Sequence, residues 1–126
     1  MTVYRIARDE EYSRLYEIFD IETPLTWPVI IAEREGDIIG MLGTHGDDRL
    51  CAGPLQVKMP QGRTHVFVAS RLARVYDDYM RSIGMKKFDF YVEKGINDHY
   101  IKQIERLPIY NKTFENDEFI WYERVF

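Results

Sequence analysis

Cysteine is nearly absent from this chain of 126 residues, since Cys51 is the only one. One cysteine cannot form an internal disulfide, so we expect a protein of a reducing compartment such as the cytoplasm. Long apolar runs are also lacking, because the longest, Trp27–Ala32, is far shorter than the roughly 20 residues that a membrane helix requires. The N-terminal segment has no apolar stretch of the signal-peptide type, and we expect neither a membrane span nor a leader.

An excess of positive charge is missing too. The net charge is −4 and the isoelectric point about 5.4, which argues against a general attraction to nucleic acids or anionic membranes. Basic residues in the second half are interrupted by Asp77 and Asp78, so a solvated face is favoured over a nucleic-acid patch. What is present is a globular composition, with 45% hydrophobic and 30% charged residues, and we predict a single domain over residues 1–126.

The first part of the chain reads as a strand, a helix and a hairpin. Thr2–Ala7 alternates in the manner of a strand. Asp9–Phe19 has apolar residues at helical spacing, and we expect Asp9 to cap this helix. Val29–Glu33 and Ile38–Thr44 are apolar runs separated by a Glu-Gly-Asp turn, which is typical of a β-hairpin.

The middle of the chain predicts a broken strand and the longest helix. Gly46–Asp48 is a second turn, and Leu50–Met59 is a strand in which Gly53-Pro54 indicates a bulge. We expect Thr64 to cap the helix that follows and Gly84 to end it. The inward stripe of this helix comprises Val68, Leu72, Val75, Tyr76, Tyr79 and Ile83.

The last part of the chain predicts a strand, a short helix and a hairpin. The strands are Phe88–Val92, Tyr110–Phe114 and Glu118–Val125, and the helix is Asn97–Arg106. The residues expected to face inward around that helix are Tyr100, Ile101, Ile104 and Leu107. Where a helix separates two strands, we expect the strands to be adjacent and parallel. The fold class is therefore α+β, or mixed α/β, with helices on both faces of one mixed sheet.

The whole order resembles the GNAT family of acyl-CoA-dependent N-acyltransferases. Val29–Gly40 is similar to the second and third strands of that family, Leu55–Pro60 to the fourth strand and phosphate loop, and Phe88–Val92 followed by Asn97 to the fifth strand and its helix. The resemblance implies a central sheet of about seven strands flanked by three to four helices. A shorter segment, Asn97–Leu107, resembles small GNAT-like proteins encoded by tailed phages, some of them internal virion proteins.

The resemblance implies acetyl-CoA as co-substrate and an amine as acceptor. In the family, backbone N–H groups of a glycine-rich loop bind the pyrophosphate of acetyl-CoA. Here Gln61 fits that loop, whereas Thr64 and Val66 stand at the glycine positions. The alternative interpretation is a plain loop in which Thr64 caps the following helix. The residues that the resemblance assigns to cofactor binding are Gln56, Val57, Lys58, Gln61, Gly62, Arg63, Thr64, His65 and Asn97.

Acyl transfer needs a base for the amine and an acid for the thiolate. Many family members use a glutamate on the fourth strand or a bound water as the base, and a tyrosine on the helix after the fifth strand as the acid. Here Leu50–Met59 has no carboxylate, and Ile104 stands where that tyrosine would fall. Tyr100 and Tyr110 are the candidate catalytic residues, and core packing is the alternative for both.

The three histidines, His45, His65 and His99, are not spaced as a metal set, and we expect no metal site. Surface or capping roles are the simplest interpretation, with His45 in a pocket as the alternative. Two functions stay open. One is an active N-acetyltransferase; the other is a catalytically inactive GNAT-like binding or assembly protein, for instance a phage-encoded virion or host-interaction protein. The partner would then be a second copy of the chain in a homodimer, a virion protein or a host protein. The protein would be located in the host cytoplasm or in the virion.

Overall fold

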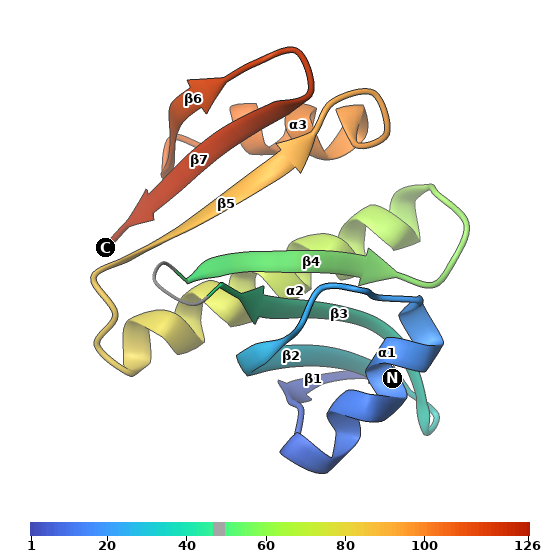
Figure 1. Cartoon of the computed structure of the whole chain (residues 1–126). Coiled ribbons are helices and arrows are strands. Elements are labelled where there is room, and N and C mark those ends of the chain that lie inside the picture. The colour runs from blue at the N-terminus through green and yellow to red at the C-terminus, as the bar shows by residue number, and fades with distance from the viewer. Residues whose placement is uncertain (47–49) are drawn as a thin grey trace.

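The computed structural model describes residues 1–46 and 50–126 and contains one mixed sheet flanked by helices (Figure 1). The predicted fold class is confirmed. The predicted turn at Gly46–Asp48 lies partly outside the described residues. The elements are β1 (Thr2–Ile6), a 3₁₀ turn η1 (Asp9–Glu11), α1 (Tyr12–Phe19), β2 (Thr26–Arg34), β3 (Asp37–His45), β4 (Cys51–Val57), α2 (Arg63–Ser82), β5 (Lys87–Glu93), α3 (Asp98–Glu105), β6 (Tyr110–Glu115) and β7 (Phe119–Val125).

The strands run in the order β1-β2-β3-β4-β5-β7-β6. The pair β4–β5 is parallel and joined by α2, as expected for a crossover through a helix. For the other two helices the expectation holds only in part, since β1 and β2 are adjacent but not parallel, and β5 and β6 are parallel but not adjacent. β1 and β2 are antiparallel, because the chain after α1 returns along the sheet before β2 begins. β5 and β6 are not adjacent, because β7, the second strand of the last hairpin, lies between them.

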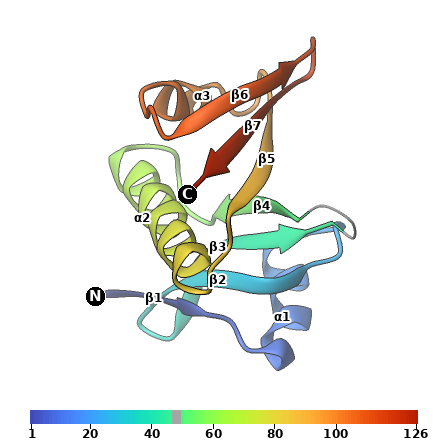
Figure 2. The same ribbon diagram turned by 90° about the vertical axis from the view of Figure 1, so that its left-hand side faces the viewer.

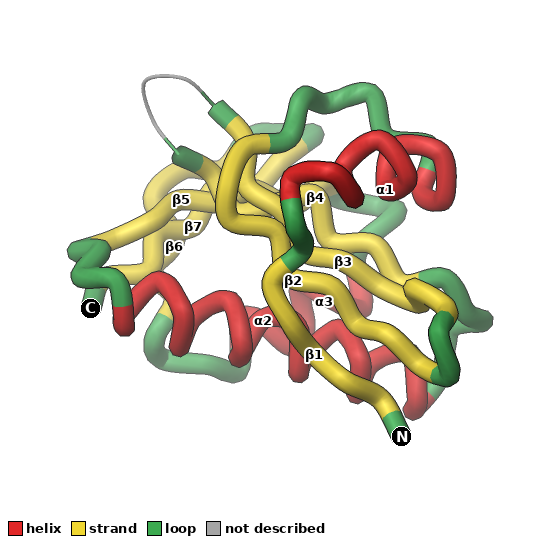
Figure 3. Tube along the Cα trace, turned by 90° about the horizontal axis from the view of Figure 1, so that it is seen from below, coloured by secondary structure: helices red, strands yellow, loops and turns green. Residues whose placement is uncertain are grey.

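The helices lie on both faces of the sheet. α1 packs against β2 and β3 from one side, and α2 with α3 lie on the other side (Figures 2 and 3). The side chains of β2 alternate between the two faces of the sheet and contribute to the hydrophobic core on each face. Ile30 packs toward α2, whereas Ile31 packs toward α1. Two residues predicted to face inward do not, because Ile83 and Leu107 follow the last helical turns and are 43% and 46% exposed.

Both predicted helix caps are displaced. Asp9 is the first residue of the 3₁₀ turn η1, and Arg8 occupies the cap position before it. The backbone N–H of Arg8 donates to Oε1 of Glu11 at 2.9 Å, so the capping carboxylate comes from inside the turn. Likewise Gly62 precedes the first residue of α2, and Thr64 lies within the first turn.

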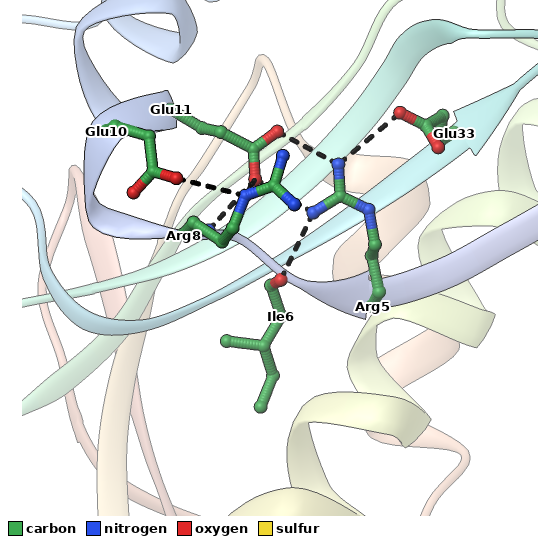
Figure 4. A network of polar contacts seen from close by, with 6 residues as sticks. All are labelled: Arg5, Ile6, Arg8, Glu10, Glu11 and Glu33. Carbon is green, nitrogen blue, oxygen red and sulfur yellow. Dashed lines mark hydrogen bonds and ion pairs between the residues drawn. The ribbon is translucent and has the colours of Figure 1, made fainter.

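Glu11 is the centre of an ion-pair network that fixes the entry into α1 (Figure 4). Arg5 of β1 donates from Nη1 and Nη2 to the two oxygens of this carboxylate, at 2.8 and 2.9 Å. Arg5 also reaches Glu33 of β2 at 3.4 Å, which ties the network to the sheet. The hydrogen bonds from Arg5, opposed by burial, lower the pKa of Glu11 from 4.5 to about 2.

Substitution of Glu11 by Gln should lower the free energy of unfolding at pH 7 by about 1–2 kcal/mol. Because the folded-state pKa is depressed, the stabilisation is complete above pH 4.5 and is lost as the pH falls toward 2. Urea unfolding across this range should therefore show wild type and variant converging at the acid end. Glu10→Gln is the matched control, since its ion pair with Arg8 is exposed. If the difference in unfolding free energy between wild type and Glu11→Gln stayed constant across this pH range, the lowered pKa of Glu11 would be contradicted.

A second ion pair joins α2 to the C-terminal strands. Arg124 of β7 donates from Nε and Nη2 to the two carboxylate oxygens of Asp77, at 2.6 and 3.1 Å, and both residues are 7% exposed. The guanidinium also lies over the ring of Phe126 at 4.6 Å. The Asp77–Arg124 ion pair thus connects β7, the neighbour of β5, with α2, which packs against β2 and β3.

Substitution of Asp77 by Ala should cost about 3–5 kcal/mol of unfolding free energy, because it leaves the Arg124 guanidinium buried without its carboxylate. Replacing both residues by leucine should recover most of that loss, since no charge is then buried. Denaturant unfolding measures both effects, with exposed Asp78→Ala as control. A single-variant loss under about 1 kcal/mol would show that the pair does not hold the two parts together.

Candidate functional site: the cleft between β4 and β5

The parallel strands β4 and β5 pair only at their beginnings. Cys51 and Asp89 are opposite one another, and no further pair between these strands occurs in the described chain. A bulge precedes the separation, because the register against β3 moves from Thr44–Ala52 to Leu42–Leu55 and leaves one extra residue in the Gly53-Pro54 stretch. The predicted bulge is thus confirmed, and from there on β4 has no strand partner on its β5 side within the described residues.

A cavity of about 700 Å³ fills the space between the two strands, and we call it the β4–β5 cleft. On the α1 face of the sheet, its lining includes His45, Tyr91 and Glu93. On the opposite face, it is lined by α2 and α3, including Ser70 and Gln103, which are exposed. Since exposed residues line it on both faces, the cleft crosses the sheet and can be entered from two sides.

α3 forms the outer wall of the cleft and has no buried residue. Asn97, Tyr100 and Ile104 of this region all line the cleft, so the helix packs over open space and not against a filled core. Apolar side chains make up much of the floor, namely Leu42, Ala52, Leu55, Val66, Ala69, Ala73, Phe88 and Phe90. Such a surface suits a largely apolar ligand with a few polar groups.

The residues predicted to bind a cofactor fall into two sets. Gln56 and Asn97 line the cleft, and Nδ2 of Asn97 donates to the carbonyl of Glu93 at 3.2 Å. Val57 instead packs against the core under α2, and the backbone N–H of Lys58 donates to Ile39 at 2.7 Å. Gln56 is therefore the last residue of β4 whose side chain lines the cleft.

The predicted phosphate loop lies at the open end of the cleft. Its members Gln61, Gly62, Arg63 and Thr64 are exposed and do not line the cleft itself. α2 begins at Arg63, so the N–H groups of its first turn have no carbonyl within the helix to bind. Val66, at one of the expected glycine positions, does line the cleft.

His65 is buried and joins this loop to α3. Its Nδ1 lies 3.2 Å from the carbonyl oxygen of Met59, which can only accept, so Nδ1 carries the proton. Nε2 then accepts from the hydroxyl of Tyr100 at 2.5 Å. The ring of His99 lies against both rings, and burial, followed by the charge of His65, lowers the pKa of His99.

Both candidate tyrosines line the cleft, in different surroundings. Burial raises the pKa of Tyr100, and burial together with the nearby Asp77 raises that of Tyr110. Both hydroxyls are therefore protonated at neutral pH and can donate but not act as bases. Tyr100 already donates to His65, while Tyr110 packs edge-on against Phe90 at 5.1 Å.

His45 is the cleft residue that is least evident from the sequence. It ends β3, lines the cleft, and its ring stands edge-on to Tyr91 across the gap at 5.8 Å. The sequence offers only a histidine next to a glycine turn, which does not distinguish a pocket residue from a surface residue.

The described residues contain no cluster of three or more potential metal-binding side chains. Within the same ranges, no helix combines the length and the apolar character needed to cross a membrane.

No protein-family model matches the sequence, and no curated protein matches it. Solved structures do match the fold. Naa50 of Arabidopsis thaliana, in complex with the bisubstrate analogue CoA-Ac-MVNAL, has a TM-score of 0.73 at 14% identity and 99% coverage of both chains. The ribosomal-protein-S18-alanine N-acetyltransferase of Escherichia coli has a TM-score of 0.76 at 13% identity, with 99% of this chain and 94% of the other covered.

A third structure, a putative streptothricin acetyltransferase of Bacillus anthracis str. Ames in complex with acetyl coenzyme A, has a TM-score of 0.70 at 13% identity with both chains covered completely. At this identity the similarity carries the fold and not the activity. The matches extend over nearly the whole chain, so they include the sheet and the helices described above. The chain therefore has the fold of the GNAT N-acetyltransferases.

Proposed function

We propose that the protein is an acyl-CoA-dependent N-acyltransferase that transfers an acetyl group from acetyl-CoA to an amine. The observation that supports this most is the separation of β4 from β5 after the single Cys51–Asp89 pair. It leaves a strand edge unpaired inside a cavity that crosses the sheet. Few ligands need both a row of backbone hydrogen-bonding groups and an apolar channel, and the pantetheine arm of CoA is one of them.

The free edge of β4 is suited to the pantetheine arm. That arm carries two amides, which can pair with backbone groups as an added strand does. Since Lys58 directs its N–H to Ile39 of β3 and the backbone groups of a strand alternate between its two edges, Leu55 and Val57 direct theirs to the cleft side of β4.

The N-terminus of α2 is suited to the pyrophosphate. The helix runs for 20 residues, so its first-turn N–H groups carry a partial positive charge. Arg63 and Thr64 add a guanidinium and a hydroxyl at the same end. Val66 stands where the family has a glycine, and its side chain lines the cleft.

The acceptor amine would enter from the α1 face, where Thr23, His45, Tyr91 and Phe119 line the cleft. Two substrates bound from opposite faces meet between the strands, near the bulge. Holding them at reacting distance provides much of the rate enhancement of such a reaction. Acetyl-CoA is a cytoplasmic metabolite, and we place the reaction in that compartment.

One observation favours the second candidate, a binding or assembly protein without catalysis. β4 has no carboxylate, and Asp77, which does line the cleft, is engaged by Arg124. A GNAT-like scaffold of this kind, such as a virion component of a phage, would keep the fold without transferring an acyl group.

Acetyl-CoA should stabilise the protein against thermal unfolding by about 2.7 kcal/mol at 100 times its Kd. Differential scanning fluorimetry with acetyl-CoA and with acetyl-pantetheine measures this, and the shorter ligand should bind more weakly because it lacks the pyrophosphate. Val66→Glu should abolish the shift by placing a carboxylate in the cleft. Phe67→Glu, with the same change of charge at an exposed neighbour outside the cleft, is the matched control. Absence of a shift at millimolar acetyl-CoA would contradict the proposal.

Tyr100 is placed at the pyrophosphate end by its bond to His65, and we propose that it positions α3 and does not protonate the thiolate. Tyr100→Phe should therefore lower the unfolding free energy by about 1–2 kcal/mol, because Nε2 of buried His65 loses its donor. The turnover rate should stay within about threefold of wild type. A loss of turnover by about two orders of magnitude or more, at unchanged stability, would instead support a catalytic role.

A further inference from the structure

His45 lies at the inner end of the cleft, where β4 and β5 begin to part. Its neighbour Thr44 donates to the carbonyl of Pro28 and contacts the Tyr76 hydroxyl of α2, which places Thr44 on the α2 side of the sheet. Since successive strand residues point to opposite faces, His45 points to the α1 side. Its backbone pairs with Cys51, the same residue that forms the single β4–β5 pair with Asp89.

The hydrogen bond of His45 determines which ring nitrogen is basic. Nδ1 lies 3.1 Å from the carbonyl oxygen of Gly53. A carbonyl oxygen only accepts, so Nδ1 holds the proton and Nε2 of the neutral ring has a free lone pair. Within residues 1–46 and 50–126, no protein group bonds to this Nε2. The ring is partly exposed and lines the cleft, so a ligand can reach it.

The groups opposite His45 favour a cation. Tyr91 of β5 presents its ring across the gap, and Glu93, two residues further along the same face, is exposed at the cleft. An aromatic ring and a carboxylate both attract an ammonium group. Cys51, which pairs with His45 from β4, is also titratable, and it is buried.

We propose that Nε2 of His45 is the general base of the transfer reaction and that the acceptor arrives as a cationic primary amine at the α1-face opening. This inference rests on the proposed function. The pyrophosphate end of the cofactor would lie at the N-terminus of α2, beyond the C-terminal end of β4, so an arm extended back along β4 would bring the thioester toward Gly53 and the His45 ring bonded to it.

The step balances without a further reactant. The ammonium group first loses a proton to Nε2 of His45. The nitrogen lone pair then attacks the thioester carbonyl carbon, and a C–N bond forms as the C–S bond breaks. The thiolate leaves with the electron pair of that bond and takes up the second amine proton, through water. His45 releases its own proton to solvent through the α1-face opening.

His45→Asn is the decisive variant, because its side-chain amide can still donate to Gly53 but has no basic nitrogen. Transfer from acetyl-CoA is measured with two probes, glycinamide, a largely cationic amine, and hydroxylamine, which is largely unprotonated at neutral pH and needs no base. We expect the glycinamide rate to fall by about 100-fold or more and the hydroxylamine rate to change by less than about threefold. Equal losses with both probes, or no loss with glycinamide, would overturn the inference.

Two measurements separate this inference from the proposed function. If wild-type protein does not bind acetyl-CoA in the fluorimetry assay, the proposed function fails and the role of His45 fails with it. If binding and hydroxylamine transfer are intact, the probe comparison tests His45 alone. Nitrogen-15 chemical shifts of the imidazole report the tautomer independently of activity. We expect the proton on Nδ1, and a proton on Nε2 of the neutral ring would overturn the inference.

Discussion

The parting of two parallel strands after one residue pair is the constraint on which the rest of the structure depends. If β4 and β5 stayed paired beyond Cys51 and Asp89, side chains would fill the space between them and no cavity would cross the sheet. The bulge at Gly53-Pro54 lies just after the Cys51–Asp89 pair. The Asp77–Arg124 ion pair holds the end of β7, and with it the beginning of β5, to α2.

Local patterns predicted most of the elements correctly. The β2–β3 hairpin and α2 were found because a turn with glycine and a helical stripe are properties of neighbouring residues. Strand direction is different, since it depends on how the chain returns after a helix. That is why the antiparallel pairing of β1 with β2 could not be predicted from the intervening α1 alone. The helix caps were displaced for a similar reason: the side chain of Glu11 reaches back to the N–H of Arg8, and nothing in the residue types predicts this choice.

The site was predicted in part. The resemblance to a family pointed to β4, to the loop after it and to the helix after β5, and these do surround the cleft. It could not distinguish Gln56, whose side chain lines the cleft, from Val57, which packs against the core, because the face that a strand residue takes depends on the register of the sheet. The contact between His65 and Tyr100 joins residues 35 positions apart, and the bond from His45 to Gly53 depends on strand register. Both require the tertiary structure.

The free edge of β4 also bears on the solubility of the fold. An unpaired strand at the outside of a sheet can recruit strands from other molecules and so promote aggregation. Here the unpaired edge with apolar neighbours lies in the middle of the sheet, facing β5 across the cleft and covered on one face by α2 and α3, so a strand of another folded chain has little room to pair with it. The outermost strand on that side, β6, carries mainly polar residues, including Asn111, Lys112 and Thr113. The fold thus leaves the backbone edge of β4 accessible to a narrow ligand while limiting its pairing with strands of other molecules of the same protein.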